Sequence, residues 1–103
     1  MPVLVVTKVK GDPDALVRAY DEVMSTPKAR DQPTRPLQQM ARTDYGMLVV
    51  DVWDSREAFL AGHGDPELTE LFERIGMDDQ ETEIWELDRT MVAGEEAPRR
   101  LGD

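Results

Sequence analysis

The 103-residue chain contains no cysteine and no asparagine, and it has a single histidine, His63. Without cysteine it has no disulfide, thiolate nucleophile or cysteine metal site, which is typical of a reducing compartment. The lack of asparagine excludes N-glycosylation, and one histidine cannot build a multi-histidine metal site. Its apolar runs are too short for a signal peptide or a membrane span. We therefore expect a cytoplasmic protein with no metal and no membrane partner.

The charged residues are unevenly distributed along the chain. Residues 1–50 carry seven basic and six acidic side chains, whereas residues 51–103 carry five basic and sixteen acidic, so the net charge of −10 lies in the second half. Such a surface repels phosphate backbones, and we expect no nucleic-acid partner. Four basic residues lie in one segment of the first half: Lys28, Arg30, Arg35 and Arg42. We interpret them as a solvated loop, with attraction of an anionic ligand as the alternative.

Hydrophobic patterning predicts three strands and a helix in the first half. A β-branched run favours a strand at 3–9, and a Gly-Asp-Pro start followed by an apolar stripe predicts a helix over 13–24. The proline-rich stretch 25–36 has no periodicity and is expected to be a loop that could serve as a lid. Two strands, 37–44 and 47–53, should form a hairpin through a tight glycine turn.

The second half predicts two helices and a closing strand. A short helix over 55–62 should begin with Asp54 as its cap, and a second Gly-Asp-Pro start predicts a helix over 66–75. An alternating pattern over 82–92 favours the last strand. The polar residues 93–103 are expected to form a poorly ordered tail.

The element order β-α-β-β-α-α-β over residues 1–92 predicts one α+β, ferredoxin-like domain with a four-stranded antiparallel sheet. Helices should cover one face of this sheet. The strand at 47–53, however, is apolar on both sides, with Leu48, Val50 and Val52 on one and Met47, Val49 and Trp53 on the other. A second copy of the chain is the simplest cover for the remaining face, so we expect a homodimer packed through its sheet faces.

The stretch GMLVVDVWDSREAFLAGH, residues 46–63, resembles the dimeric α/β-barrel superfamily, and in particular its antibiotic-biosynthesis-monooxygenase-like branch. The resemblance implies two ferredoxin-like chains forming a dimeric α/β barrel, with a ligand cavity between each sheet and its own helices. Members include oxygenases that need no cofactor, polyketide cyclases and haem-degrading enzymes. No cofactor is therefore expected here.

The resemblance also implies which side chains line the cavity. Trp53 matches the pocket tryptophan of the strand, and Phe59 matches an aromatic residue of the following helix. Gln39 falls where some relatives place a strand histidine, and Val49 stands where oxygenase members can have a polar residue. Gln39 cannot act as a base at neutral pH.

Asp51 is the most informative of the polar candidates. Strand alternation places it between Val49 and Trp53, on the side that we assign to the cavity. Among apolar neighbours its pKa would rise, giving an acid or base that works near neutral pH. The alternative is a salt bridge with Arg42 on the neighbouring strand, which would keep the carboxylate ionised.

His63 is the second acid–base candidate, because it follows Phe59 by four residues and can share its face of the helix. We favour a plainer interpretation, in which the imidazole simply ends a helix and interacts with its carbonyl terminus. Tyr20 could donate a hydrogen bond to a ligand, although its position on the helix stripe favours packing.

The sequence thus predicts a small-molecule enzyme resembling cofactor-independent monooxygenases or polyketide cyclases. A flat, mostly apolar compound, aromatic or polyketide-like, would lie between Trp53 and Phe59 as walls, with Gln39 and Arg42 as orienting donors. Asp51 or His63 would transfer protons. The alternative is a non-catalytic dimer of the same fold that binds a ligand or regulates a partner.

Overall fold

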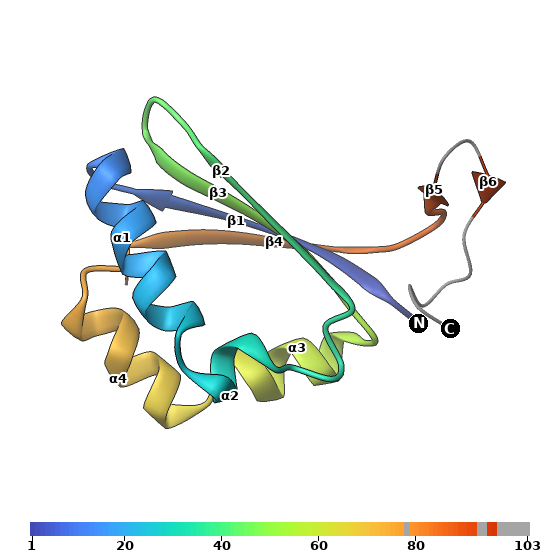
Figure 1. The fold of residues 1–103 in the computed structure, drawn as a ribbon. Coiled ribbons are helices and arrows are strands. Elements are labelled where there is room, and N and C mark those ends of the chain that lie inside the picture. Colours follow the sequence, from blue (N-terminus) through green and yellow to red (C-terminus); the bar gives the residue numbers. More distant parts are fainter. Residues whose placement is uncertain (78, 93–94, 97–103) are drawn as a thin grey trace.

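The computed structural model describes residues 1–77, 79–92 and 95–96 (Figure 1). Its helices and strands, in chain order, are β1 (Val3–Lys10), α1 (Pro13–Met24), α2 (Pro27–Arg30), β2 (Leu37–Arg42), β3 (Gly46–Trp53), α3 (Arg56–His63), α4 (Pro66–Arg74), β4 (Gln80–Glu86), β5 (Met91–Val92) and β6 (Glu95–Glu96).

Four of the strands form an antiparallel sheet in the order β2-β3-β1-β4. Figure 1 shows α1, α2, α3 and α4 on one side of this sheet, with the short β5–β6 pair beyond its end. This is the ferredoxin-like arrangement of an α+β domain, and the predicted fold class is confirmed. No helix within the described residues is long and apolar enough to cross a membrane.

The repeated Gly-Asp-Pro starts a helix in both places. The Asp12 carboxylate accepts a hydrogen bond from the Ala15 backbone N–H at 2.9 Å, and the Asp65 carboxylate accepts one from the Glu67 N–H, also at 2.9 Å. In each case proline occupies the first helical turn, where no backbone donor is needed. The two longer helices therefore begin where the sequence predicts.

The start of α3 differs from the prediction by one residue. Ser55, not Asp54, is the cap, and its hydroxyl accepts a hydrogen bond from the Ala58 N–H at 3.0 Å. The backbone N–H of Asp54 is instead bonded to the Thr34 carbonyl at 2.8 Å. Because that bond keeps Asp54 beside the segment leading into β2, the helix begins one residue later.

The hairpin between β2 and β3 depends on a glycine. Gly46 has a φ of 148°, and a Cβ at this position would collide with the carbonyl oxygen of Val9 on the neighbouring strand. The predicted role of Gly46 in the turn is therefore confirmed. A hydrogen bond from the Thr43 N–H to the Gly46 carbonyl, 3.0 Å long, closes the turn.

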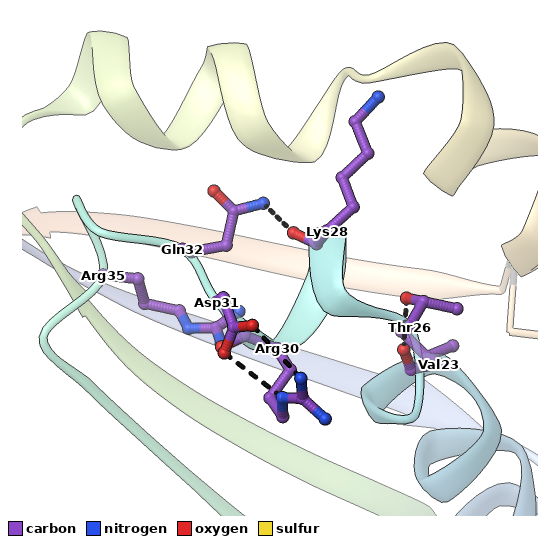
Figure 2. A network of polar contacts seen from close by, with 7 residues as sticks. All are labelled: Val23, Thr26, Lys28, Arg30, Asp31, Gln32 and Arg35. Carbon is purple, nitrogen blue, oxygen red and sulfur yellow. Dashed lines mark hydrogen bonds and ion pairs between the residues drawn. The ribbon is translucent and has the colours of Figure 1, made fainter.

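The predicted loop 25–36 contains one turn of helix, α2, which the sequence analysis missed. The Thr26 hydroxyl bonds to the Val23 carbonyl at the end of α1, and the Arg30 and Asp31 N–H groups bond back to Thr26 and Pro27 (Figure 2). A single turn is too short to produce a periodic pattern, so its sequence could not reveal it.

The last strand of the sheet, β4, spans residues 80–86 and not the predicted 82–92. β4 pairs with β1 from Gln80 opposite Val9 to Glu86 opposite Val3. No partner remains beyond the start of β1, and the final bond runs from the Leu87 N–H to the Pro2 carbonyl at 2.9 Å. The residues after it form β5, which pairs with β6. Most of the predicted tail, 93–94 and 97–103, lies outside the described residues.

The buried apolar side chains form two groups on the helix side of the sheet. The larger joins α1, α4 and the sheet and consists of Val9, Leu16, Ala19, Val23, Ala29, Met47, Val49, Leu68, Leu71 and Met77. The smaller consists of Val3, Val5, Trp53 and Phe59, beneath α3. Burial of these apolar side chains holds the helices against the sheet.

Within the described part of the chain, no helix lies over the opposite face of the sheet (Figure 1). Val6 lies opposite Val50 and Leu4 opposite Val52 on neighbouring strands, which makes the centre of this face apolar. Trp85 of β4 is aligned with Leu4 and is 60% exposed. This helix-free face, centred on these five residues, is the surface that the sequence analysis assigned to a second chain.

Candidate active site

A cavity of about 80 Å³ lies on the helix side of the sheet, lined by members of both buried groups. Its walls come from β1, β2, β3, α1, α3, α4 and the segment around α2. Most lining side chains are apolar or aromatic. Among the described residues, the lining side chains of formal charge are Asp51 and Arg35. An apolar hollow with a few polar groups is the usual form of a small-molecule site.

Asp51 is held within this cavity by the alternation of β3, with only 7% of its surface exposed. Its Oδ2 accepts a hydrogen bond from the Trp53 indole N–H at 3.2 Å, whereas its buried Oδ1 has no hydrogen-bond partner among the described residues. Burial raises the pKa of Asp51 above its ordinary 3.8, and the nearby Gln38 and Trp53 side chains and the charges of Arg35 and His63 offset part of that rise.

The alternative prediction for Asp51, a salt bridge with Arg42, is wrong. Arg42 pairs with Asp14 at the start of α1, with the nitrogen and oxygen atoms 3.3 Å apart, and both side chains are largely exposed. Arg42 lies opposite Met47, at the end of β2 far from Asp51 in register. It therefore does not line the cavity, and its predicted role as an orienting donor is not supported by its position.

Trp53 lines the cavity as the sequence predicts, whereas Phe59 is buried against it and does not line the cavity, so the predicted role of Phe59 as a wall is not supported by its position. Their ring centroids are 5.6 Å apart at an interplanar angle of 74°, an edge-to-face contact of the favourable kind. Gly62 of α3 packs against the indole, and a Cβ there would lie 2.9 Å from Cη2 of Trp53. The glycine thus allows α3 to approach the tryptophan closely.

His63 lies at the last position of α3 and also lines the cavity. Its ring stacks on Phe59, with centroids 5.0 Å apart, and lies 5.8 Å from the ring of Phe72. Burial lowers the pKa of His63 below its ordinary 6.5, and the Asp51 charge raises it in part. The lowered pKa favours the neutral imidazole, and His63 lies in the last turn of α3, where the plainer interpretation places it.

The polar side of the cavity differs from the prediction by one residue. Gln38, opposite Asp51 in the β2–β3 register, lines the cavity, whereas Gln39 is exposed on the helix-free face. The Tyr20 hydroxyl donates to Oε1 of Gln38 at 2.6 Å, and burial raises the pKa of Tyr20. Tyr20 and Val49 line the cavity as expected, but Gln39 cannot reach it.

Arg35, which the sequence analysis named only as part of a basic segment that could attract an anionic ligand, lines the cavity. It belongs to the segment between α2 and β2, and its guanidinium carbon lies 5.8 Å from the ring centroid of Trp53. The signals in the sequence were the cluster of basic residues and the nearby Pro33 and Pro36, which stiffen that segment.

Metal binding has no visible basis in the part of the chain that the structure describes. No group of three or more His, Cys, Asp or Glu side chains there is arranged to hold a metal ion. The cavity offers acid–base groups and aromatic walls instead.

No family model matches the sequence, and no curated protein matches it. Solved structures do. SnoaB, a cofactor-independent oxygenase from Streptomyces nogalater, superimposes with a TM-score of 0.67 over 87% of this chain and 96% of its own, at 19% identity. The chain has the fold of the antibiotic biosynthesis monooxygenases. The resemblance seen in residues 46–63 is thereby confirmed for the fold.

Two further structures share this monooxygenase fold. The monooxygenase ActVA-Orf6 of Streptomyces coelicolor, solved with nanaomycin D, matches with a TM-score of 0.61 at 20% identity, covering 88% of this chain and 90% of its own. A dimeric ferredoxin-like protein of Thermobifida fusca matches with a TM-score of 0.61 at 17% identity, covering 84% and 92%. At such identities the similarity defines the fold alone.

Proposed function

We propose that the protein is an enzyme of the cofactor-independent monooxygenase kind, which binds a flat, mostly apolar aromatic compound in the cavity beside Trp53. The single observation that carries the proposal is Asp51, a buried carboxyl group with one unpartnered oxygen in an aromatic cavity. The names of SnoaB and ActVA-Orf6 support the reaction class. The lack of cysteine supports a cytoplasmic location.

Asp51 is the proposed general base. A carboxylate in an apolar site is a stronger base than one in water, because burial disfavours its charged form. The Trp53 N–H binds Oδ2, and Oδ1 would be the atom that accepts the proton of a reacting C–H or O–H group. His63, neutral and stacked between two phenylalanine rings, is the proposed second proton carrier.

Oxidation at an activated CH₂ group can proceed without a cofactor if the substrate supplies the electrons. Asp51 would take one proton from the CH₂, and the resulting carbanion would reduce O₂ and form a C–O bond. Asp51 would return its proton to give a hydroperoxide, and loss of water would leave a carbonyl group. One oxygen atom enters the product and the other leaves as water.

The size of the cavity restricts what it holds in this conformation. A cavity that accommodates benzene measures about 150 Å³, and drug-sized ligands need about 300 Å³ or more. The cavity here is about 80 Å³. Even a single-ring ligand would therefore require the cavity to widen, and the segment around α2, which supplies Ala29, Gln32 and Arg35 to the lining, would have to move outward.

We further propose that two chains associate through the helix-free face. Leu4, Val6 and Val50 occupy its centre, and the 60% exposure of Trp85 is unusual for an indole. The dimeric ferredoxin-like protein of Thermobifida fusca offers a structural precedent. Helices already cover the other side of the sheet, so the helix-free face is the one whose apolar surface a second chain would bury.

Oxygen uptake with two probes, 1,8-dihydroxyanthrone and hydroquinone, tests the proposed activity. The wild type should accelerate uptake with 1,8-dihydroxyanthrone, whose CH₂ group the proposed step requires, and not with hydroquinone, which has no such group. Asp51→Asn should lower the rate with 1,8-dihydroxyanthrone by about 10²-fold or more. Asp44→Asn, an exposed carboxylate in the β2–β3 turn, is the matched control and should keep the wild-type rate. An unchanged rate for Asp51→Asn would contradict the role of this residue.

The second candidate function is ligand binding without turnover. It is favoured by a wild type that binds these probes beside Trp53 but leaves the oxygen uptake at its spontaneous rate.

A further inference from the structure

Three of the four basic side chains of the segment from Lys28 to Arg42 are paired with carboxylates. Lys28 binds Asp65 with its Nζ 2.8 Å from the carboxylate, and the Nη2 atom of Arg30 lies 3.1 Å from Asp31. Arg42 is paired with Asp14, as described above. Each of these charges is already neutralised at the surface.

Arg35 is the exception. No carboxylate of the described residues lies within ion-pair distance of it, and it contacts the Trp53 ring instead. Its Nη2 donates to the Arg30 carbonyl at 3.2 Å, which holds the side chain along the α2–β2 segment (Figure 2). A guanidinium carries five N–H donors, so most of its donors remain available.

The placement of Arg35 is unusual for a merely solvated arginine. Its side chain is half-buried, and among the described residues it is the one cation that lines the cavity. The chain as a whole has a charge of −10, with abundant carboxylates that could have paired with it. An unpaired cation in a partly desolvated site is costly unless a ligand supplies the counter-charge.

We propose that the ligand of this cavity carries a carboxylate that pairs with Arg35, while its aromatic ring packs on Trp53. The proposal deepens the proposed function by naming the substrate class, and it rests on that function only for the cavity being the ligand site. The planar fork of an arginine matches the two oxygens of a carboxylate. Arg35 would thus recognise the charge of the ligand, and Trp53 would recognise its aromatic ring.

Arg35 and Asp51 have different tasks. Arg35 binds the charged group and orients the ring, and it exchanges no proton because its guanidinium stays protonated. Asp51 lines the same cavity and is the proton acceptor of the proposed function. The positive charge of Arg35 also acts on the Asp51 carboxyl group, so it would offset the repulsion between that group and the ligand carboxylate.

Benzoate and benzamide are suitable probes, because they have nearly the same shape and differ in charge. Calorimetric titration should show that the wild type binds benzoate about tenfold or more tightly than benzamide, as expected for charge-assisted hydrogen bonds. Arg35→Gln should abolish this preference. Arg35→Lys, which keeps the charge and loses the fork, should retain part of it.

Arg42→Gln is the matched control, since Arg42 is an arginine of the same region that pairs with Asp14 away from the cavity. It should preserve the full preference for benzoate. Thermal melts of all variants verify that each is folded before binding is compared.

Equal binding of the two probes to the wild type, or an undiminished preference in Arg35→Gln, would overturn the proposal while leaving the oxygenase hypothesis intact. A benzoate preference that depends on Arg35, in a protein that oxidises neither dihydroxyanthrone nor hydroquinone, would support this inference and reject the oxygenase hypothesis. Binding of neither probe would overturn this inference.

Discussion

The Trp53 indole N–H donates to Oδ2 of Asp51, two residues earlier on β3, across a distance of 3.2 Å in a buried site. Residues at this spacing project from the same side of a strand, so the bond is a direct consequence of β3 being straight there. It fixes one carboxylate oxygen and leaves the other, Oδ1, without a partner. The geometry of the proposed base is therefore determined by its own neighbour on the strand.

Removing this donor should change the acidity of Asp51. Trp53→Phe eliminates the N–H that favours the ionised carboxylate, so the pKa of Asp51 should rise further and the pH–rate profile should move to higher pH. Trp85→Phe removes the other indole of the chain, which donates to Glu83 on the helix-free face, and should leave the profile in place. A shift of the profile in the control variant, or no shift in Trp53→Phe, would show that the Trp53 N–H does not control the acidity of Asp51.

Burial of Asp51 should also make stability depend on pH. Because its folded-state pKa lies above 3.8, the folded protein keeps a proton that the unfolded chain releases. Stability should therefore decline as the pH rises from about 3.8 through the folded-state pKa, and then level off. Asp51→Asn should lack this decline, which urea denaturation of both proteins from about pH 3 to about pH 7 measures.

His63 contributes in a different pH window and with the opposite sign. Its pKa is lowered from 6.5, so the unfolded chain gains a proton first and stability falls as the pH drops below about 6.5. Both proteins in the comparison contain His63, and the Asp51 charge acts on the pKa of His63, so the difference between them reports Asp51 together with this coupling. A difference that stays constant with pH would show that Asp51 is not buried as described.

Gly62 provides a test of the aromatic wall. Helix propensity alone predicts that Gly62→Ala stabilises α3 by about 0.5–1 kcal/mol. The added Cβ would lie 2.9 Å from Trp53, so we expect a net loss of about 1–3 kcal/mol and weaker ligand binding. Ala61→Gly, at an exposed neighbour in the same helix, should weaken stability without affecting binding. A net stabilisation by Gly62→Ala would show that the Trp53 indole does not pack against Gly62.

The proposed dimer can be tested on the helix-free face. Analytical ultracentrifugation should give a wild-type mass near twice the 11.7 kDa of one chain. Val50→Lys places a charge at the centre of this face and should yield monomers, because a buried unpaired charge is strongly unfavourable. Leu60→Lys adds the same charge at an exposed site on α3 and should remain dimeric. A monomeric wild type would contradict the assembly.

Much of the fold could be predicted because its signals are local. The caps Asp12 and Asp65 lie next to the helices they start, and Gly46 marks its own turn. The end of β4 could not be predicted, since it depends on where β1 runs out of residues to pair with. Strand boundaries of this kind are set by the partner rather than by the strand.

Site residues that follow from alternation within one strand were predicted correctly. Those that depend on the pairing register of two strands were missed. Asp51 and Trp53 follow from alternation within β3, whereas choosing Gln38 over Gln39 requires the pairing of β2 with β3, and a shift of one residue reverses the faces. Arg35 comes from an irregular segment whose path depends on contacts with the rest of the chain. No periodic pattern could have placed it over Trp53.

The most direct test of the account is a titration of the Asp51 carboxyl carbon by NMR, with aspartate labelled at that carbon and Asp51→Asn used to assign the signal. The account predicts that Asp51 titrates at a higher pH than its ordinary value of 3.8 and that an aromatic ligand in the cavity perturbs its signal. A midpoint at or below 3.8, with a signal that no ligand affects, would show an ordinary solvated carboxylate and contradict the proposed base.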